Sequence, residues 1–311
     1  MKLSIITPIY NEELNIKPLY DSLKSVLSSM RVKYEIIYVD DGSTDDSLKN
    51  IKDLRKKDKN VKFIKFRKNF GQTAALNAGL KYATGDYVVT LDADLQNDPK
   101  DIPRLIQKLK EGYDLVVGWR YDRKDPFFKK ISSLFASFLK TLVLKEQIHD
   151  PGCMLKAFTK NAAKDLELYG EMHRYITALL KLKGYKITEI KVRHLPRVHG
   201  KTKYGSKRLI KGFLDLLIIK FWMDYSTRPI HFFGGLGILS SLIGLISGVY
   251  LVIDKFAFGK PIGNRPLLLF SVLLIILGFL LVIFGFLADI MVKIYYNQKN
   301  EESYSIEYKQ F

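Results

Sequence analysis

Residues 87–96 read YVVTLDADLQ, an apolar run that ends in two carboxylates. Because the run is short and rich in aromatic and β-branched residues, it predicts a buried strand over 87–91. Asp92 and Asp94 leave this strand two positions apart, so we expect their side chains to point the same way and to concentrate negative charge. Mg²⁺ is typically held by one or two carboxylates together with substrate phosphate oxygens. Aspartates at this spacing also arise by chance, so their meaning depends on the surrounding fold.

The residues before this stretch alternate between strand-like and helix-like patterns. Strands are predicted at 3–7, 35–39 and 61–66, and helices, from their apolar spacing, at 12–30, 44–58 and 72–83. Strands that alternate with helices favour an α/β fold: a mostly parallel sheet with right-handed crossovers and a Rossmann-like layer architecture. In such sheets ligands bind beyond the carboxyl ends of the strands, so we expect a site there.

Polar residues follow each of the four predicted strands. They read PIYNE at 8–12, DDGSTD at 40–45, RKNFGQ at 67–72 and DADLQ at 92–96. Ser43 or Thr44 is expected to cap the helix that follows. Four such clusters at one edge of a sheet are hard to explain by capping alone, and together they predict a binding site.

Two apolar stretches, 230–253 and 267–292, have the length of about 20 residues that crosses a bilayer. A buried helical hairpin is the alternative, but two stretches with so little charge are uncommon in soluble cores. Basic residues crowd the segment before the first stretch, namely Lys201, Lys203, Lys207, Arg208, Lys211, Lys220 and Arg228. By the positive-inside rule, the chain before and after the pair of stretches is expected on the cytoplasmic side. Three basic residues between the stretches weaken this contrast without reversing it.

The formal net charge of +18 indicates an anionic partner. A membrane face or a phosphorylated substrate is favoured over nucleic acid, because no nucleic-acid-binding module is visible and the basic residues gather beside the apolar stretches. Residues 127–144 and 206–225 each combine an apolar face with basic residues, which is typical of helices that lie in the membrane interface; ordinary packing against the α/β domain is the alternative. The single cysteine, Cys153, excludes an internal disulfide and is expected to pack in a core strand.

Seven short stretches form a specific combination, although each alone is weak: ITPIYNE (6–12), VDDGSTD (39–45), NFGQ (69–72), LDADLQ (91–96), DPGCML (150–155), EMHRY (171–175) and GKTKY (200–204). With the two apolar stretches, they resemble inverting family 2 glycosyltransferases that act on polyisoprenyl phosphates. This group includes dolichyl-phosphate mannose synthases, bacterial lipid-phosphate glucosyltransferases and undecaprenyl-phosphate aminoarabinose transferases. The resemblance covers nearly the whole chain.

The resemblance implies a GT-A fold and a multi-pass protein of the cytoplasmic membrane. The implied organisation is a cytosolic catalytic domain (1–205), an amphipathic juxtamembrane helix (206–228), a transmembrane helix (229–253), an extracytoplasmic loop (254–265), a second transmembrane helix (266–292) and a cytosolic tail (293–311). The implied partners are a nucleotide-sugar donor, a polyisoprenyl phosphate acceptor and the membrane. Relatives include tetramers, so a homo-oligomer is a further expectation, and no nucleic-acid partner is expected.

Matching positions receive donor-site roles from the same resemblance. The nucleotide is expected to contact Pro8, Tyr10, Glu12, Asp40, Asp92, Arg197 and Lys203, the last two from a loop that closes over the diphosphate. A divalent metal, Mg²⁺ or Mn²⁺, is expected beside Asp92, Asp94 and Gln96.

The acceptor and catalytic positions follow in the same way. The acceptor phosphate is expected to contact Arg120, Lys129 and Ser133, and the catalytic group is expected to be Asp94, Asp150 and Arg120. An acceptor phosphate monoester is already largely dianionic at neutral pH, because its second pKa is about 6. It therefore needs positioning more than deprotonation, and we hypothesise that Asp150 orients the acceptor in a single inverting displacement. His173 and Arg174 resemble the family's helix at the back of the site.

Other functions fit the sequence less well. A processive polysaccharide synthase shares the catalytic fold, but its Gln-x-x-Arg-Trp motif does not occur here. A catalytically silent nucleotide-sugar-binding membrane scaffold would not need the Asp92/Asp94 pair. For the donor we favour a UDP-sugar over a GDP-sugar, because 92–96 and 150–155 look closest to the bacterial undecaprenyl-phosphate enzymes.

Overall fold

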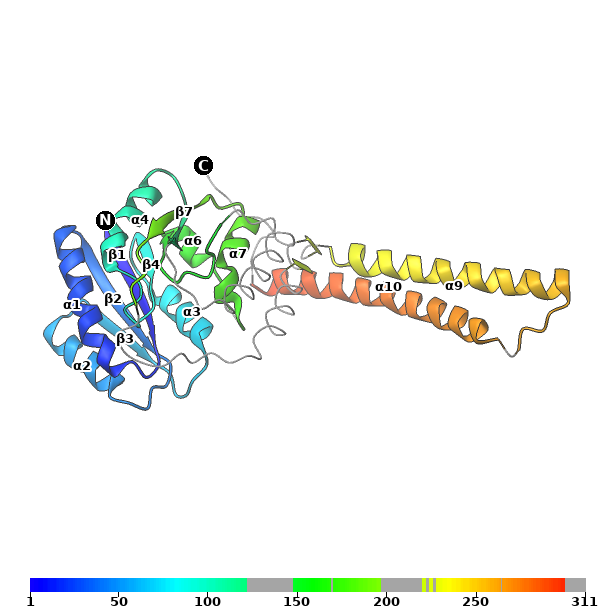
Figure 1. The fold of residues 1–311 in the computed structure, drawn as a ribbon, viewed down its shortest axis with the longest axis horizontal. Helices are drawn as coiled ribbons and strands as arrows, with labels where there is room; N and C mark the ends of the chain where they lie inside the picture. The colour runs from blue at the N-terminus through cyan, green and yellow to red at the C-terminus, as the bar shows by residue number, and fades with distance from the viewer. Residues whose placement is uncertain are drawn as a thin grey trace. The chain divides into compact units, whose positions relative to one another are not determined.

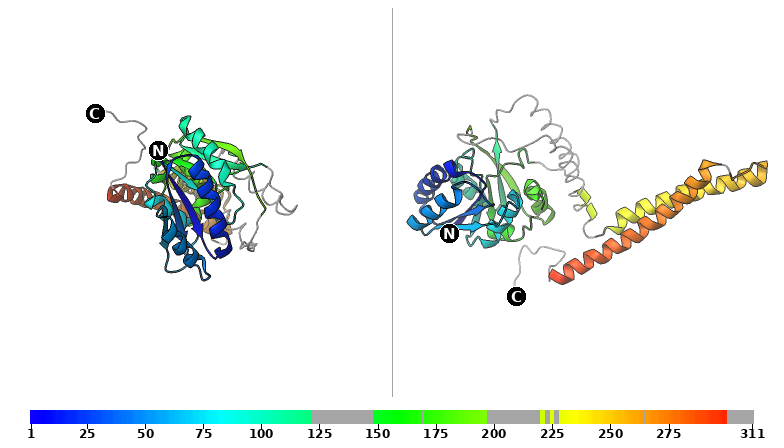
Figure 2. Two further views of the ribbon diagram at one scale, coloured as in Figure 1. Left: turned by 90° about the vertical axis from the view of Figure 1, so that its left-hand side faces the viewer. Right: turned by 90° about the horizontal axis from the view of Figure 1, so that it is seen from below.

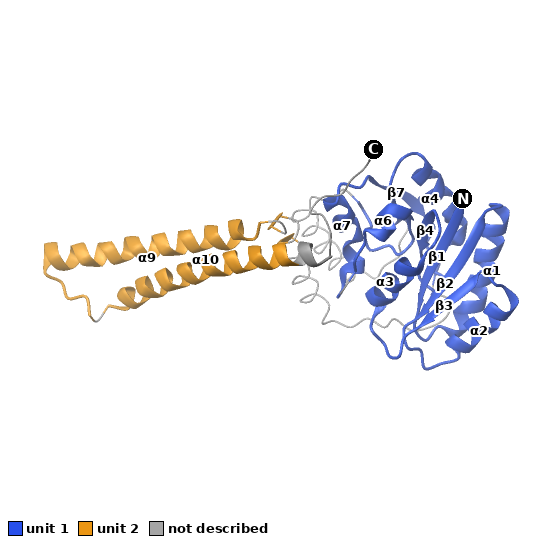
Figure 3. Ribbon diagram, turned by 180° about the vertical axis from the view of Figure 1, so that it is seen from behind, with its two compact units in different colours: residues 1–216 blue, residues 217–311 orange. Residues whose placement is uncertain are grey.

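The chain divides into two compact units, residues 1–216 and 217–311 (Figure 3). The structure, a computed structural model, describes residues 1–121, 148–168, 170–196, 220–221, 224–225, 228–263 and 265–299. The predicted amphipathic segments 127–144 and 206–225 fall wholly or mostly outside these ranges and stay predictions.

A seven-stranded sheet in the order β3-β2-β1-β4-β6-β5-β7 forms the centre of the first unit (Figure 1). Its strands are β1 (Lys2–Ile9), β2 (Lys33–Asp40), β3 (Val61–Lys65), β4 (Tyr87–Thr90), β5 (Leu115–Arg120), β6 (Lys156–Thr159) and β7 (Ile187–Val192). Strand β6 runs antiparallel to both of its neighbours, and the other pairings are parallel. The sheet is therefore mostly parallel, as predicted, with one reversed strand between β4 and β5.

Helices cover both faces of this sheet. They are α1 (Glu13–Ser29), α2 (Ser47–Lys57), α3 (Gln72–Tyr82), α4 (Ile102–Lys110), α6 (Lys160–Lys164) and α7 (Ile176–Leu182), with the short 3₁₀ turns η1 (Pro99–Asp101) and η2 (Met172–Tyr175). Helices α1 and α2 pack together, whereas α3 lies against β1 and β2 with α6 and η2 beside it (Figures 1 and 2). Because both faces are covered, the inner strands are nearly continuous apolar runs, and Leu3, Ile5 and Ile6 have no exposed surface.

The strands and helices predicted over residues 3–91 are confirmed, with ends that differ by no more than three residues. Strands β5, β6 and β7 were not part of that prediction. Cys153 is buried, but it lies in the turn before β6, so its predicted place in a strand is wrong.

The second unit contains two long helices, α9 (Ile230–Phe258) and α10 (Pro266–Lys299), which run side by side (Figures 1 and 2). Both are long and apolar enough to cross a membrane, with mean hydropathies of 2.2 and 3.3. Only 17% and 11% of their apolar windows are buried, which differs from the core helices of soluble proteins. The composition of these helices therefore suits a lipid environment.

Small residues bring α9 and α10 into close contact. A Cβ atom on Gly278 would lie 2.4 Å from the carbonyl oxygen of Gly237, so neither helix accepts a larger residue there without shifting. Ser271 Oγ also donates to Ser247 Oγ over 2.8 Å. Such small-residue contacts are characteristic of helix pairs in membranes.

A carboxylate lies at each end of this hairpin. Asp289 Oδ1 accepts a hydrogen bond from the Ile230 backbone nitrogen over 3.1 Å and so caps the first turn of α9. At the other end, Asp254 is almost fully buried and pairs with Arg265 and with Lys260, whose Nζ lies 3.1 Å away. Both ends of the hairpin are therefore tied by a side chain of the partner helix or of the connecting loop.

Candidate active site

The loops after β1 and β2 are joined by hydrogen bonds at the carboxyl edge of the sheet. Asn11 has a positive φ of 52°, its backbone nitrogen donates to Ser43 Oγ over 3.0 Å, and its Oδ1 accepts from the Thr44 nitrogen over 2.8 Å. Helix α2 begins only at Ser47, so the prediction that Ser43 or Thr44 caps it is wrong. These side chains instead join the two loops into one surface.

Two aspartates at the end of β2 have different environments. Asp40 has no exposed surface; its Oδ1 accepts from the Ser43 nitrogen over 3.0 Å, and its Oδ2 is buried with no hydrogen-bond partner among the described residues. Asp41 accepts from the backbone nitrogens of Phe70 and Gly71 over 2.7 and 2.9 Å. Burial nevertheless raises the pKa of the Asp41 carboxyl. Asp41 therefore fixes the segment before α3, whereas one oxygen of Asp40 has no donor among the described residues.

Three further residues predicted to contact the nucleotide, Pro8, Tyr10 and Glu12, lie on the same edge. Pro8 is in β1 opposite Val39, and Tyr10 follows that strand with 36% of its surface exposed. Glu12 precedes α1, and its carboxylate accepts from Asn15 Nδ2 over 2.6 Å. Arg197 and Lys203 lie outside the described residues.

Asp92 and Asp94 follow β4 in a tight, strained turn. Asp94 is buried, and its Oδ1 accepts from the backbone nitrogen of Gln96 over 3.2 Å. Leu95, which follows Asp94, has a φ of 61°, which a residue with a Cβ atom adopts at a cost of about 1–2 kcal/mol. Such strain gathers at functional sites because the surrounding structure holds it in place.

Gln72, the first residue of α3, holds the first of these carboxylates. Its Nε2 donates to Asp92 Oδ1 over 2.8 Å. Gln72 ends the polar stretch after the third predicted strand, and no role was predicted for it. The next residue, Thr73, contacts His173 through Oγ1 and Nδ1 at 2.6 Å. The start of α3 thus links the Asp92 turn to the EMHRY segment.

Arg120 and Asp150 form a two-pronged ion pair at the end of β5. Arg120 Nε donates to Asp150 Oδ2 over 2.6 Å, and Nη2 donates to Oδ1 over 2.9 Å. Burial would raise the pKa of the Asp150 carboxyl, but the hydrogen bonds and charge of Arg120 outweigh it, so that the pKa is below its usual range. Asp150 is therefore a carboxylate at neutral pH and a weak proton acceptor. Lys129 and Ser133, predicted beside Arg120, lie outside the described residues.

A buried lysine supports this corner of the sheet. Lys156 has no exposed surface, and its Nζ donates to the carbonyl oxygen of Cys153 in the turn that follows Asp150. Burial lowers the pKa of the Lys156 ammonium and raises the pKa of the Cys153 thiol. A buried thiol with a raised pKa is unreactive, so Cys153 packs rather than reacts.

The chemistry of the Asp92 turn suits a divalent cation. No group of three or more His, Cys, Asp or Glu side chains that could hold a metal occurs in the described part of the chain. Asp92 and Asp94 offer two carboxylates, and Mg²⁺ characteristically takes one or two protein carboxylates and completes its shell with phosphate oxygens and water. The residues present fit a metal that binds together with a diphosphate.

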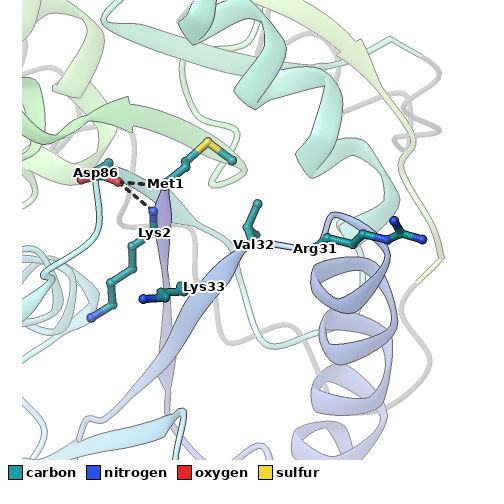
Figure 4. A pocket seen from close by; sticks show the side chains of 6 residues that line it. All are labelled: Met1, Lys2, Arg31, Val32, Lys33 and Asp86. Carbon is teal, nitrogen blue, oxygen red and sulfur yellow. Dashed lines mark hydrogen bonds and ion pairs between the residues drawn. The ribbon is translucent and has the colours of Figure 1, made fainter.

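A pocket of about 490 Å³ lies at the other end of the sheet (Figure 4). It is lined by Met1, Lys2, Arg31, Val32, Lys33 and Asp86. These residues precede or begin β1 and β2 or precede β4, so they are at the amino ends of the parallel strands. Ligands of such sheets bind at the carboxyl ends, so this pocket is separate from the candidate site.

Comparison with known proteins shows the family to which this chain belongs. The family model described as glycosyl transferase family 2 matches residues 4–167, and the chain belongs to this family. A dodecaprenyl-phosphate galacturonate synthase of Rhizobium johnstonii is 39% identical, over 98% of this chain and 92% of its own length. An undecaprenyl-phosphate 4-deoxy-4-formamido-L-arabinose transferase of Klebsiella pneumoniae is 32% identical, over 98% of this chain and 93% of its own.

A solved structure supports the GT-A-like fold. Glucosyl-3-phosphoglycerate synthase from Mycobacterium tuberculosis, in complex with Mn²⁺, UDP and phosphoglyceric acid, superposes with a TM-score of 0.55. The sequences are 20% identical, and the match covers 71% of this chain and 78% of that one. The same enzyme has been solved with Mg²⁺ and UDP, with a TM-score of 0.52, 22% identity and coverage of 69% and 79%. The predicted family and fold class are confirmed.

Proposed function

We propose that this chain transfers a sugar from a nucleotide-sugar to a polyprenyl phosphate in one inverting displacement. The observation that carries the proposal is the meeting, at one sheet edge, of Asp40, the Asp92/Asp94 turn and the Arg120–Asp150 pair. The full-length relatives named above, whose names state sugar transfer to polyprenyl phosphates, support the same chemistry.

Donor recognition is assigned to the loops after β1 and β2. Pro8, Tyr10 and Glu12 border the nucleobase and ribose, and the buried Oδ2 of Asp40 accepts a hydrogen bond from the nucleotide. A buried acceptor without a partner costs about 1–3 kcal/mol, so a donor on the ligand would recover that cost. Arg197 and Lys203 are assigned to the diphosphate on the resemblance alone.

The Asp92 turn is assigned to the diphosphate and its metal. Asp92, Asp94 and Gln96 would hold Mg²⁺ or Mn²⁺, which when bound neutralises charge on the departing diphosphate. The hydrogen bond from Gln72 fixes the Oδ1 atom of Asp92 and so orients its carboxylate. These residues therefore supply binding and orientation rather than proton transfer.

The acceptor phosphate is assigned to Arg120, Lys129 and Ser133. A guanidinium has five N–H donors, and the Asp150 pair uses Nε and one donor of Nη2, so among the described residues three are left that a phosphate could accept from. Asp150 acts by aiming this guanidinium, because a carboxylate with a lowered pKa is a weak base and the acceptor is largely dianionic. The phosphate oxygen attacks the anomeric carbon opposite the diphosphate and inverts it.

The two apolar helices are proposed to span the cytoplasmic membrane, with residues 1–205 and the tail from 293 in the cytosol and 254–265 outside. The donor is proposed to be a UDP-sugar, and the names of the two relatives suggest UDP-galacturonate and a UDP-aminoarabinose derivative as the first sugars to test. Both carry a polar group beyond ordinary hydroxyls, which a GDP-mannose donor lacks.

The test is transfer from radiolabelled UDP- and GDP-sugars to polyprenyl phosphate with Mg²⁺ or Mn²⁺. We expect one UDP-sugar to label the lipid, the label to disappear in Asp94→Asn, and Asp150→Asn to retain a measurable rate. Loss of all transfer in Asp150→Asn with acceptor binding intact would make Asp150 a base. Metal-dependent nucleotide binding without any lipid product would point to the silent scaffold instead.

A further inference from the structure

Four side chains form an aromatic and cationic cluster at the carboxyl ends of β5 and β7. The Trp119 ring stacks on His149 with 4.2 Å between centroids and meets Tyr121 edge-on at 5.7 Å. Lys191 lies opposite Trp119 in the strand register, and its Nζ is 4.2 Å from the Tyr121 centroid and 5.3 Å from that of Trp119. We call these four residues the docking patch: Trp119, Tyr121, His149 and Lys191.

This cluster lies at the surface rather than in the core. Tyr121 has 64% of its surface exposed, and His149 and Lys191 are also exposed, whereas Trp119 is half-buried. Trp and Tyr next to a lysine are characteristic of the membrane–water interface, because their rings have an apolar body and a polar end. The lysine adds attraction to anionic headgroups.

Residues of the docking patch are sequence neighbours of the two residues of the candidate acceptor site. Arg120 lies between Trp119 and Tyr121 in sequence, and Asp150 directly follows His149. The ion pair of Arg120 and Asp150 is therefore held by the same two backbone segments that carry the patch. A membrane surface that contacts the patch would therefore lie close to the Arg120–Asp150 ion pair.

The partner of the docking patch follows from the proposed acceptor, which is a lipid of the bilayer. The inference therefore rests on the proposed function. A polyprenyl phosphate stays in the bilayer through its hydrocarbon chain and presents only its phosphate at the headgroup level. The sheet edge that carries Arg120 must therefore approach the headgroups. The exposed rings and ammonium beside Arg120 fit that layer by both polarity and charge.

We propose that Trp119, Tyr121, His149 and Lys191 seat the carboxyl edge of the sheet in the headgroup layer of an anionic phospholipid bilayer. The rings enter the interfacial layer, Lys191 pairs with lipid phosphates, and Arg120 reaches the depth at which the acceptor phosphate lies. The patch acts by positioning, since none of its members takes part in the displacement.

Tryptophan fluorescence tests the seating directly and without catalysis. The chain has two tryptophans, so Trp222→Phe leaves Trp119 as the reporter in the full-length protein. In liposomes that contain anionic phospholipid, we expect phospholipids brominated near the headgroup end of the acyl chain to quench Trp119 more than those brominated deep in the chain. No quenching by either lipid would overturn the proposal.

A pair of matched double variants tests the consequence for transfer. Tyr121→Asp with Lys191→Ala removes the patch, and Tyr82→Asp with Lys81→Ala makes the same change at a tyrosine of α3 that is similarly exposed (62%). In anionic liposomes the patch variant should lose about tenfold in transfer, since the attraction of Lys191 for the anionic surface is lost and the new carboxylate adds repulsion. With a short-chain prenyl phosphate in detergent it should match wild type, and the α3 variant should match wild type in both assays.

The two assays separate the possible failures. Equal losses in liposomes and detergent, or no loss in liposomes, would overturn the docking role. If wild type transfers nothing in either assay, the proposed function fails, and the quenching result still decides whether the patch contacts lipid.

Discussion

Gln72, Arg120 and Asp41 matter at the residue scale because each fixes another group of the candidate site. Gln72 orients Asp92, Arg120 pairs with Asp150, and Asp41 accepts from the two backbone nitrogens that directly precede α3. Preorganised side chains of this kind lower the cost of ordering a site when a ligand arrives. Substitutions at these positions should therefore affect binding before they affect folding.

Gln72→Leu should weaken metal binding while the fold is kept. The substitution removes the hydrogen bond to Asp92 Oδ1, and a hydrogen bond to a charged group contributes about 1.5–3 kcal/mol, equivalent to about tenfold or more in affinity. Mn²⁺ titration in the presence of UDP, followed by electron paramagnetic resonance, measures the change. An unchanged Mn²⁺ affinity would show that Asp92 needs no support from α3.

Glu35 should make stability depend on pH at the opposite end of the sheet. Burial would raise its pKa, but hydrogen bonds from Lys62, Ser4 and Thr84 lower it to about 2. Because the folded pKa lies below the unfolded value near 4.5, the stabilisation is complete above about pH 4.5 and is lost as pH falls towards 2.

Denaturation of wild type and Glu35→Gln in detergent checks this dependence. Each pKa unit corresponds to 1.36 kcal/mol, so the difference in unfolding free energy should reach about 3 kcal/mol near neutral pH. It should shrink between pH 4.5 and 2. A difference that is constant across this range would mean that Glu35 contributes through packing and not through its charge.

At the scale of elements, the hairpin of α9 and α10 depends on a few positions without side chains. Gly278 faces the Gly237 carbonyl at a distance that excludes a Cβ atom, whereas a Cβ atom on Gly248 would meet nothing within 4 Å. These two glycines lie in helices of the same hairpin but have opposite tolerance for a methyl group.

Gly278→Ala should therefore lower the melting temperature of the detergent-solubilised protein, and Gly248→Ala should leave it unchanged or raise it. The added methyl group at Gly278 separates the helices, while at Gly248 it improves helix propensity by up to about 1 kcal/mol. Differential scanning fluorimetry compares the two variants. Equal shifts would show that the close contact does not hold the hairpin together.

The predictability of the elements differed between the two halves of the sheet. Strands β1 to β4 were found from the sequence because each is a short apolar run followed by a polar cluster. Strand β6 was not, because its sequence KAFT begins with a fully buried lysine, and its antiparallel direction depends on pairing with two strands distant in sequence. A lysine inside a sheet is unexpected from sequence, because burying its ammonium is costly unless another part of the fold supplies a hydrogen-bond partner.

The candidate site was predictable to a similar extent. The polar stretches after each strand indicated Asp40, Asp92 and Asp94. Asp40 and Asp94 accept from backbone nitrogens of their own stretches, whereas the side chain that fixes Asp92 comes from α3. The pairing of Arg120 with Asp150 and of Gln72 with Asp92 joins residues that are 30 and 20 positions apart, which no local pattern encodes.

At the scale of the whole molecule, the proposed topology places the loop 254–265 and the sheet on opposite sides of the membrane. The single native cysteine, Cys153, is buried, so after Cys153→Ala a new cysteine can report on either side. Gly263 in the loop and Ser28 in α1 are both exposed.

Labelling of intact cells with a membrane-impermeant maleimide tests this topology. We expect Gly263→Cys to react in intact cells and Ser28→Cys to react only after permeabilisation, because the basic residues before α9 hold that side in the cytosol. Labelling of Ser28→Cys in intact cells would reverse the orientation.

The carboxylates at the two ends of the hairpin also limit how it adapts to bilayers of different thickness. Asp289 ties the start of α9 and Asp254 ties the connecting loop, so the helices cannot slide past each other to change their combined length. At about 1.5 Å per residue, the 29 residues of α9 extend over about 43 Å, more than a hydrocarbon core of about 30 Å. A hairpin of fixed length can meet a thinner bilayer by tilting, and such a tilt would change the angle at which the chain enters and leaves the membrane surface.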